Sequence, residues 1–442
     1  MTGAHAPSTP AGGVKGGGFA LAFIFLTVLL NMIGFGIIMP VMPGLLMAVA
    51  DAPLSDAARW GGYLSLVYAV AQFVMMPIIG GLSDRFGRRP VMLASLAAYS
   101  FDFLIMAVAP SITVLLIARL FSGAFAATFS TANAYIADIS PPEKRAANFG
   151  LMGAAFGLGF IIGPGIGGIL GEAFGPRAPF FAVAAIGALN FVFGFFAMPE
   201  TLAPQNRRRF EWRRANAFGN FRQFAKYPVM LPIAATIFLL QLANWTFPSV
   251  WSYFASEKFA WGADEIGWSL MFVGFMAALV QAGVVRLVVP AIGERASALV
   301  GMAIATATYF GFAIAPDERT IYALIAISAF AALATPALQG IMSRTIPADA
   351  QGELQGAIGA VMSVSMVLGP PVMTQVFAAF SEPTAPIGFF GLPIAPEGVG
   401  VYFPGAPFIL AGILSGLAVF PALAAFGRIA RPRTPATTPA AE

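Results

Sequence analysis

Long runs of apolar residues alternate along the chain with short segments rich in Gly, Pro or charged residues. A helix crosses the hydrocarbon core of a bilayer with about 20 apolar residues, and runs of that length recur between residues 19 and 427. We therefore predict an all-α membrane protein with twelve transmembrane helices, at residues 19–46, 61–82, 91–109, 111–137, 147–170, 179–199, 229–255, 264–289, 296–315, 320–341, 354–379 and 405–427.

The composition agrees with a membrane protein and excludes several kinds of chemistry. Only 10% of the residues are charged, whereas a soluble domain carries about 25%. The chain has no Cys, and its single histidine, His5, lies in a Gly- and Pro-rich leader that we predict to be disordered. We therefore expect no metal, no cofactor and no enzymatic site built on Cys or His. The net charge of +4 is too small to indicate nucleic acid as a partner.

Lys and Arg residues fall mainly on one side of the predicted crossings. If both termini are cytoplasmic, that side holds 19 of the 24 Lys and Arg residues. By the positive-inside rule this predicts a multi-pass protein of the inner (plasma) membrane with cytoplasmic termini. The predicted regions are a leader (1–18), an N-terminal bundle (19–199), a basic linker (200–228), a C-terminal bundle (229–427) and a tail (428–442). The linker is either a solvated connection between the bundles or a site for anionic lipid headgroups or a partner.

The two bundles are a diverged repeat. A shift of 206 residues aligns glycines, arginines and prolines of the first half with those of the second, such as Gly87 with Gly293 and Gly163-Pro164 with Gly369-Pro370. Each half has six crossings, so the halves form a parallel repeat about an axis along the membrane normal. The binding site is expected between them, and one chain is expected to form a complete pathway and to function as a monomer.

The loop between the second and third crossings reads GGLSDRFGRRP, from Gly80 to Pro90. The positive-inside rule explains its arginines but not its acid or its glycines. We predict that the carboxylate pairs with neighbouring arginines and with the N-terminus of another helix, as a latch that breaks when the halves rock. The residues of this cytoplasmic gate are Gly80, Asp84, Arg85, Gly87 and Arg88.

The fifth crossing carries glycines at helical spacing and one proline. Glycines three and four residues apart allow close helix contact, and proline permits a bend. Tight packing alone is one explanation, although the full pattern is much more specific than a single GxxxG pair. The pattern consists of Gly150, Gly159, Gly163, Pro164, Gly167 and Gly168.

Two charged residues lie well inside predicted crossings. Asp102 comes eight residues before Pro110 and Arg119 nine residues after it, so a helical hairpin places both at about the same depth. Each charge costs about 2.5–3.5 kcal/mol at the membrane centre, which calls for a partner, a wet cavity or a use. The pair either pins the hairpin or couples proton movement to transport, since Asp titrates and Arg does not.

Uncharged polar residues and an aromatic run complete the candidate cavity. The polar side chains either bond between helices or face the cavity, and the run from Asn244 to Phe254 is either an interfacial belt or a surface for an amphipathic, ring-containing substrate. The predicted cavity residues are Asn31, Gln72, Asn133, Gln241, Trp245, Phe247 and Gln281.

At these motifs the chain resembles the major facilitator superfamily, and within it the tetracycline/proton antiporters. The resemblance rests on GFGIIMPVMPGLL from Gly34, the loop from Gly80, RLFSGAF from Arg119, NAYIADI from Asn133, the glycine pattern and PALQGIMSR from Pro336. It implies alternating access driven by protons, with a role in coupling for Asp102 and Arg119, and the drug pathway for Gln72. The chain departs from the family at Asn31 and Ala305, where such exporters have aspartates.

The function expected from this resemblance is proton-coupled export of an amphipathic organic compound or drug. With two family carboxylates absent, Asp102 is expected to be the sole membrane carboxylate available for coupling. The alternative on the same fold is an uncoupled facilitator or a proton symporter. A membrane sensor or an embedded enzyme is the alternative of another class, for which the chain offers neither an extra domain nor a catalytic constellation.

Overall fold

The computed structural model describes residues 17–126, 128–211, 230–345, 351–382, 384, 387–389, 392–395 and 398–430. Most of the predicted leader, of the linker and of the tail therefore lies outside the described residues, and α1 begins at Gly17, within the predicted leader. Twelve helical spans between Phe19 and Arg428 are long and apolar enough to cross a membrane, which confirms the predicted number and order.

The N-terminal half contains helices α1 to α7. Its elements are α1 (Gly17–Ala50), α2 (Leu54–Phe86), α3 (Arg88–Val108), α4 (Ile112–Phe125), α5 (Thr128–Ile139), η1 (Pro142–Lys144), α6 (Arg145–Phe174), α7 (Ala178–Ala197) and η2 (Pro204–Asn206).

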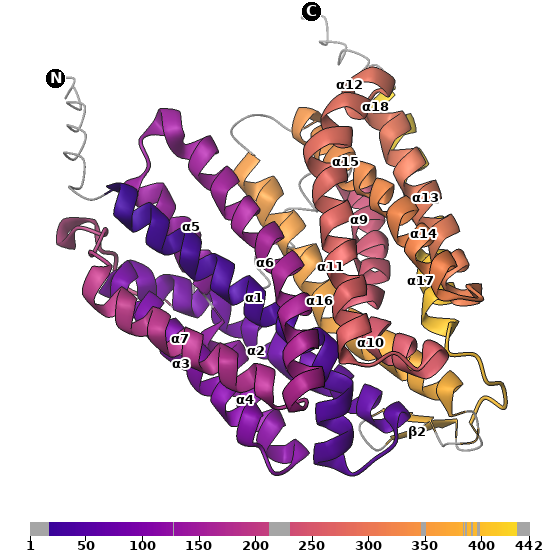
Figure 1. The fold of residues 1–442 in the computed structure, drawn as a ribbon. Helices are drawn as coiled ribbons and strands as arrows, with labels where there is room; N and C mark the ends of the chain where they lie inside the picture. The colour runs from indigo at the N-terminus through magenta and orange to yellow at the C-terminus, as the bar shows by residue number, and fades with distance from the viewer. Residues whose placement is uncertain are drawn as a thin grey trace, which may run out of the picture.

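The C-terminal half contains helices α9 to α18, several of which join to make one crossing. Its elements are α9 (Met230–Asn244), α10 (Thr246–Phe259), α11 (Ala263–Leu279), the π-helix η4 (Val280–Val284), α12 (Val285–Ile292), α13 (Glu294–Ile314), α14 (Glu318–Ser328), η5 (Ala329–Leu333), α15 (Ala334–Thr345), α16 (Gln351–Ser381), α17 (Ala406–Leu417) and α18 (Val419–Ala430). Figure 1 shows the two halves side by side, the first in indigo to magenta and the second in red to yellow.

The internal repeat is visible in the backbone. Gly87 between α2 and α3 has φ +108°, and Gly293 between α12 and α13 has φ +83°. Both glycines donate their N–H to the carbonyl four residues earlier, at Ser83 and Val289 respectively. The same left-handed turn thus ends the second crossing of each half, because glycine adopts it without steric cost.

A short hairpin interrupts the helical fold in the loop after α16. Strands β1 (Ile387–Phe389) and β2 (Leu392–Ala395) pair antiparallel. These residues lie between the predicted crossings at 354–379 and 405–427, where the sequence analysis assigns no secondary structure. The all-α prediction holds for the membrane-crossing part of the described chain, and this hairpin is the departure from it.

The packing of the core shows that the two halves meet at one end only. One cluster of buried residues contains side chains of both halves, among them Leu45, Phe180, Trp251 and Phe377. The two other clusters each belong to a single half, one around Phe23 and Met92, the other around Met230, Ala337 and Ala422. We call the end with the shared core, which carries the loops at residues 51–53, 175–177 and 260–262, the closed end. The end with separate cores, which carries Gly17 and Ala430, is the open end.

Candidate functional site

A cavity of about 250 Å³ lies between the two halves. Helices α1, α2, α3 and α4 supply most of its lining, and α10 and α16 supply the rest. Of the predicted cavity residues, Asn31, Gln72 and Trp245 lie in this lining, together with Asp102 and Arg119. The cavity thus lies between the halves, where the internal repeat predicts the site.

Asp102 of α3 and Arg119 of α4 form an ion pair at the cavity wall. The Asp102 side chain is 1% exposed and that of Arg119 is 11% exposed. The Arg119 guanidinium also lies over the Tyr68 ring, 5.6 Å from its centroid, and contacts the Met106 sulfur. The opposite charges and the aromatic face compensate the removal of both ions from water. The helical hairpin thus brings the two charges to the same depth, as their spacing predicts.

The polar residues of the lining hold their side chains by local hydrogen bonds. Asn31 donates from Nδ2 to the Thr27 carbonyl, one turn earlier in α1, at 2.8 Å. Gln72 donates from Nε2 to the Ala126 carbonyl at 3.3 Å, which ties α2 to the end of α4. One N–H of the Asn31 amide is therefore bonded to the backbone of its own helix, and the residue lies in the cavity lining.

Sequence analysis missed most of the apolar and aromatic lining. It includes rings from both halves, Phe35, Tyr68, Tyr99, Phe103, Phe125 and Tyr253, and thioethers at Met32, Met39, Met42 and Met366. Rings and flexible thioethers suit an amphipathic ring compound of variable shape. These residue types are common throughout the crossings, so the sequence alone does not distinguish the lining members from the packed ones.

Four predicted cavity residues lie outside this lining. Asn133 of α5 and Gln241 of α9 are half-buried, and Gln281 is exposed in the π-helix η4. Phe247 stacks on Trp251 with centroids 4.7 Å apart and meets Phe312 edge to face at 5.2 Å. Much of the predicted aromatic run thus packs in the core that both halves share at the closed end, while Trp245 reaches the cavity.

The glycine pattern of the fifth crossing lies on α6 and packs against two different helices. A Cβ at Gly159, Gly163 or Gly167 would come within 2.5 Å of atoms of α1. A Cβ at Gly168 would lie 2.5 Å from the Ala263 carbonyl oxygen of α11, in the other half. Pro164 packs against Gly36 of α1. The pattern therefore joins α6 to α1 within one half and to α11 across the interface.

The cavity opens toward the end that carries Gly17 and Ala430. One face of α6 packs on α11 at Ile161 and Gly168. Toward the start of α6 the same face carries Gly150 and Gly153, which are exposed, and a Cβ at either would meet no described atom within 4 Å. Gly352 and Gly359 at the start of α16 are exposed in the same way. At the closed end, by contrast, α6 contacts α11, and α2 contacts α16 at Gly62 and Thr374. Among the described residues, the two halves are therefore in contact at the closed end and separated at the open end.

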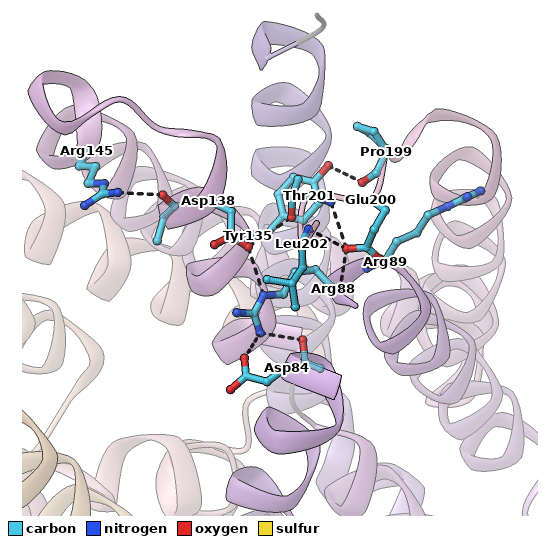
Figure 2. Close-up of polar contacts among 12 residues, drawn as sticks. Asp84, Arg88, Arg89, Tyr135, Asp138, Arg145, Pro199, Glu200, Thr201 and Leu202 are labelled. Carbon is cyan, nitrogen blue, oxygen red and sulfur yellow. Dashed lines mark hydrogen bonds and ion pairs between the residues drawn. The ribbon is translucent and has the colours of Figure 1, made fainter. Parts of the chain in front are cut away.

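The predicted gate loop is held by a polar network at the open end (Figure 2). Arg88 donates to the Asp84 carboxylate at 2.6 Å and to the Asp138 carboxylate of α5 at 3.2 Å. The predicted pairing of Asp84 with a neighbouring arginine is therefore present, whereas Arg85 is exposed and lies against Phe86. A Cβ at Gly80 would meet no described atom within 4 Å.

Glu200, just after α7, caps the start of α3 (Figure 2). Its carboxylate accepts from the backbone N–H groups of Arg88 at 2.9 Å and Arg89 at 3.2 Å, and also from those of Thr201 and Leu202 at 3.0 Å. A carboxylate at a helix N-terminus satisfies free N–H groups and favours the helix dipole. Asp138 and Glu200 are missed by sequence analysis because they lie 50 and 112 residues from Arg88.

Among the described residues, no group of three or more His, Asp and Glu side chains has the geometry to hold a metal ion. The described lining of the cavity offers one carboxylate, one guanidinium, serine and tyrosine hydroxyls, two amides, an indole, thioethers and apolar rings.

Comparisons with known proteins give likenesses in sequence and in fold. A family model described as Major Facilitator Superfamily matches residues 24–370 and 233–442. The chain is 38% identical to the class C tetracycline resistance protein of Escherichia coli over 360 residues, which cover 81% of this chain and 90% of that protein. It is 34% identical to the class B protein of Escherichia coli over 352 residues, which cover 79% and 86%.

Among solved structures, the chain resembles a bacterial homologue of the human lysosomal transporter Spinster in an inward-facing and unoccupied conformation. The TM-score is 0.73 at 18% identity, and the match covers 95% of this chain and 99% of that chain. The human organic anion transporter MFSD10 has a TM-score of 0.64 at 21% identity, with 92% and 99% covered. These likenesses extend over both halves of the bundle.

Proposed function

Because the chain belongs to the major facilitator superfamily of membrane transporters, we propose that it is a proton-coupled efflux antiporter. Its substrate is an amphipathic, ring-containing organic compound, with tetracycline as the first candidate because relatives at 34–38% identity are tetracycline resistance proteins. The chain moves this compound by alternating access without converting it chemically.

The observation that carries the proposal is a buried carboxylate beside a cavity that is open at one end. Among the described residues that line the cavity, Asp102 is the one acid and Arg119 the one cation. A solute that enters from the open end therefore meets a titratable group that is shielded from the closed end by the shared core. Transport coupled to protons needs this combination of a solute site and a proton site.

The pair suggests how proton and substrate exclude each other. With the carboxylate charged, the Asp102–Arg119 pair is neutral. A proton on Asp102 removes the carboxylate charge and leaves the Arg119 guanidinium as the net charge of the cavity. That change disfavours binding of a substrate with a positively charged group, so proton binding drives substrate release. Exchange of one proton for a substrate with one positive charge moves no net charge, so the pH gradient drives it, at about 1.4 kcal/mol or about tenfold per pH unit.

The orientation is part of the proposal. The Lys and Arg distribution favours cytoplasmic termini in the inner membrane, so the open end faces the cytoplasm and the closed end the periplasm. Membrane lipids surround the bundle, and one chain encloses the cavity between its own two halves, which supports function as a monomer.

The test is transport by purified protein in vesicles with a proton gradient and a pH-sensitive dye. Tetracycline and a panel of amphipathic drugs are added to wild type and to Asp102→Asn. Release of protons that depends on substrate, in wild type only, is the expected result. Full proton-driven exchange by Asp102→Asn would refute the role of Asp102.

An uncoupled facilitator or a symporter is the second candidate, and one observation favours it. Position 31 in the cavity lining is an amide rather than an acid, so the cavity has a single carboxylate, and that carboxylate is paired with Arg119. Substrate movement without proton flux in both proteins of the same assay would establish a facilitator. Proton and substrate movement in the same direction would establish a symporter.

A further inference from the structure

An ion pair at the open end of the C-terminal half joins α13 to α15. Glu294, the first residue of α13, accepts from the Arg344 guanidinium of α15 at 3.1 Å. Glu294 also packs on α15, since a Cβ at Gly340 would lie 2.5 Å from its carboxylate. The Glu294 side chain is 21% exposed, whereas that of Arg344 is 80% exposed. A second carboxylate can therefore reach the guanidinium from outside its own half.

The N-terminal half carries the same ion pair with its charges exchanged. The shift of 206 residues that relates the halves maps position 88 to 294 and position 138 to 344. In the N-terminal half, Arg88 of α3 pairs with Asp138 of α5 at 3.2 Å (Figure 2). The third crossing thus starts with the base of the pair in one half and with the acid in the other.

Stability within each half does not explain this exchange. Either order of charges gives a neutral pair, and a helix N-terminus favours the acid. The C-terminal half follows that preference with Glu294. The N-terminal half places Arg88 there instead and caps the helix with the Glu200 carboxylate. The opposite polarity of the two pairs therefore points to the surface where the halves face each other.

The closed end shows how equivalent helices of the two halves meet. The first crossings are in contact there, because Ser252 of α10 donates to the Met39 carbonyl of α1 at 2.7 Å. Each half of a major facilitator consists of two inverted three-helix repeats, so the fourth crossing corresponds to the first with the opposite orientation. By this symmetry the fourth crossings should meet at the open end when it shuts. Their last turns, at the ends of α5 and α15, carry Asp138 and Arg344.

The charges at these two positions decide whether the helix ends attract or repel each other. A two-fold axis brings equivalent positions of two partners together. Two carboxylates at such positions would repel each other, whereas a carboxylate opposite a guanidinium attracts it. Arg344 binds Glu294 through Nη2, and a guanidinium has five N–H donors, so it can accommodate a second acid.

We propose that Asp138 and Arg344 form an ion pair between the two halves when the open end shuts, as a lock for that conformation. Arg88 and Glu294 keep their partners, so the lock is a cluster of four alternating charges without net charge. While the end is open, each half neutralises its own pair, so a solute that enters between the halves meets no net charge at either pair. The proposal rests on the alternating access proposed above.

The test exchanges the charges of the C-terminal pair in Glu294→Arg/Arg344→Glu. This variant keeps the net charge and the ion pair within its half, but it places like charges at positions 138 and 344. Spin-labelled cysteines at Ala147 and Gly352, exposed and uncharged positions of the two halves at the open end, serve for pulsed distance measurement. We expect the ratio of short to long distances to fall about fivefold, since an exposed ion pair changes an equilibrium about two- to fivefold and its reversal acts twice. The fall should disappear in about 1 M salt, where the Debye length is about 3 Å.

Two further variants serve as controls. Glu294→Gln/Arg344→Gln has no charge at either position, so its ratio should lie between those of wild type and of the exchanged variant. In an Asp138→Asn background the exchange should lose most of its effect, because the partner across the interface is then uncharged.

An unchanged distance distribution in the exchanged variant would overturn the lock, and so would an equal fall in the Asp138→Asn background. A single distance in wild type, at every pH and with or without tetracycline, would overturn the alternating access on which the lock rests. Because the measurement needs no transport, its outcome is independent of the coupling ion.

Discussion

The two adjacent glycines of α6 allow the conformational equilibrium and the stability of the fold to be perturbed separately. In Gly168→Ala the new methyl would lie 2.5 Å from the Ala263 carbonyl oxygen and 3.0 Å from Asp264 Cα, both in the backbone of the other half. In Gly167→Ala the methyl would lie 2.5 Å from the Ile37 carbonyl oxygen and 2.8 Å from Ile37 Cα, within the same half.

The magnitude follows from the rigidity of backbone contacts. Overpacking of this kind costs about 1–3 kcal/mol, because the neighbouring backbone has to shift. For Gly168→Ala the cost falls only on the conformation in which the closed end is shut, so a cost of about 2 kcal/mol reduces its population relative to other states about 30-fold. For Gly167→Ala the contact with α1 persists in every conformation, so the same cost lowers the free energy of unfolding and leaves the populations unchanged.

The assay uses the absence of cysteine from the chain. Cysteines placed at Lys144 and Gly352, exposed positions of the two halves at the open end, carry spin labels for pulsed distance measurement. Gly168→Ala is expected to increase the population of short distances, as the open end closes. Gly267→Ala should act in the same way, because its methyl would lie 2.6 Å from the Pro164 carbonyl oxygen across the same interface. An unchanged distance distribution in Gly168→Ala, or an equal shift in Gly167→Ala, would refute the reasoning.

Three further changes test the polar contacts by thermal unfolding. Arg119→Leu leaves the Asp102 carboxylate buried without its partner, so we expect the free energy of unfolding to fall by about 3–5 kcal/mol. The double variant Arg119→Leu/Asp102→Asn should recover much of this free energy. Gly87→Ala should lower the unfolding temperature, since φ is +108° and the methyl would collide with Glu200, whereas an unchanged temperature would exclude strain there. At Asp317, which caps α14, a backbone N–H lowers the carboxyl pKa below its usual 3.8, so the stabilisation is complete above pH 4 and is lost as pH falls through the lowered pKa. The unfolding temperature of Asp317→Ala should therefore fall below that of wild type at pH 7 and converge with it in acid; a constant difference would contradict the cap.

The sequence was sufficient for the crossings and for the depth of the central ion pair. Crossings follow from the number of apolar residues in a run, and each predicted run overlaps a helical span of the structure. Asp102 and Arg119 lie on neighbouring arms of one hairpin, so the rise per residue alone equalises their depth. Both predictions depend on distances along one or two consecutive helices.

The sequence was not sufficient for the rotation of each helix about its axis. Gln72 and Gln241 are both polar residues inside crossings, but only Gln72 lies in the cavity lining. In lipid a helix has no polar solvent face to fix its rotation, so packing against distant helices decides which side chains line the cavity. Partners far apart along the chain, such as Glu200 for the start of α3, are missed for the same reason.

The cavity is chemically unequal in its two walls. The N-terminal half supplies its acid and its base, whereas the lining residues of the C-terminal half, among them Trp245, Ser249 and Met366, are all uncharged. In the proposed mechanism the coupling groups therefore belong to the N-terminal half alone, whereas both halves contribute to the wall that a substrate contacts. We expect chimeras that exchange the C-terminal half with that of a relative to acquire a new range of exported compounds while they retain the same driving ion. The gene segments for the two halves would then diverge at different rates, because changes in the second half alter the range of exported compounds and leave the coupling residues unchanged.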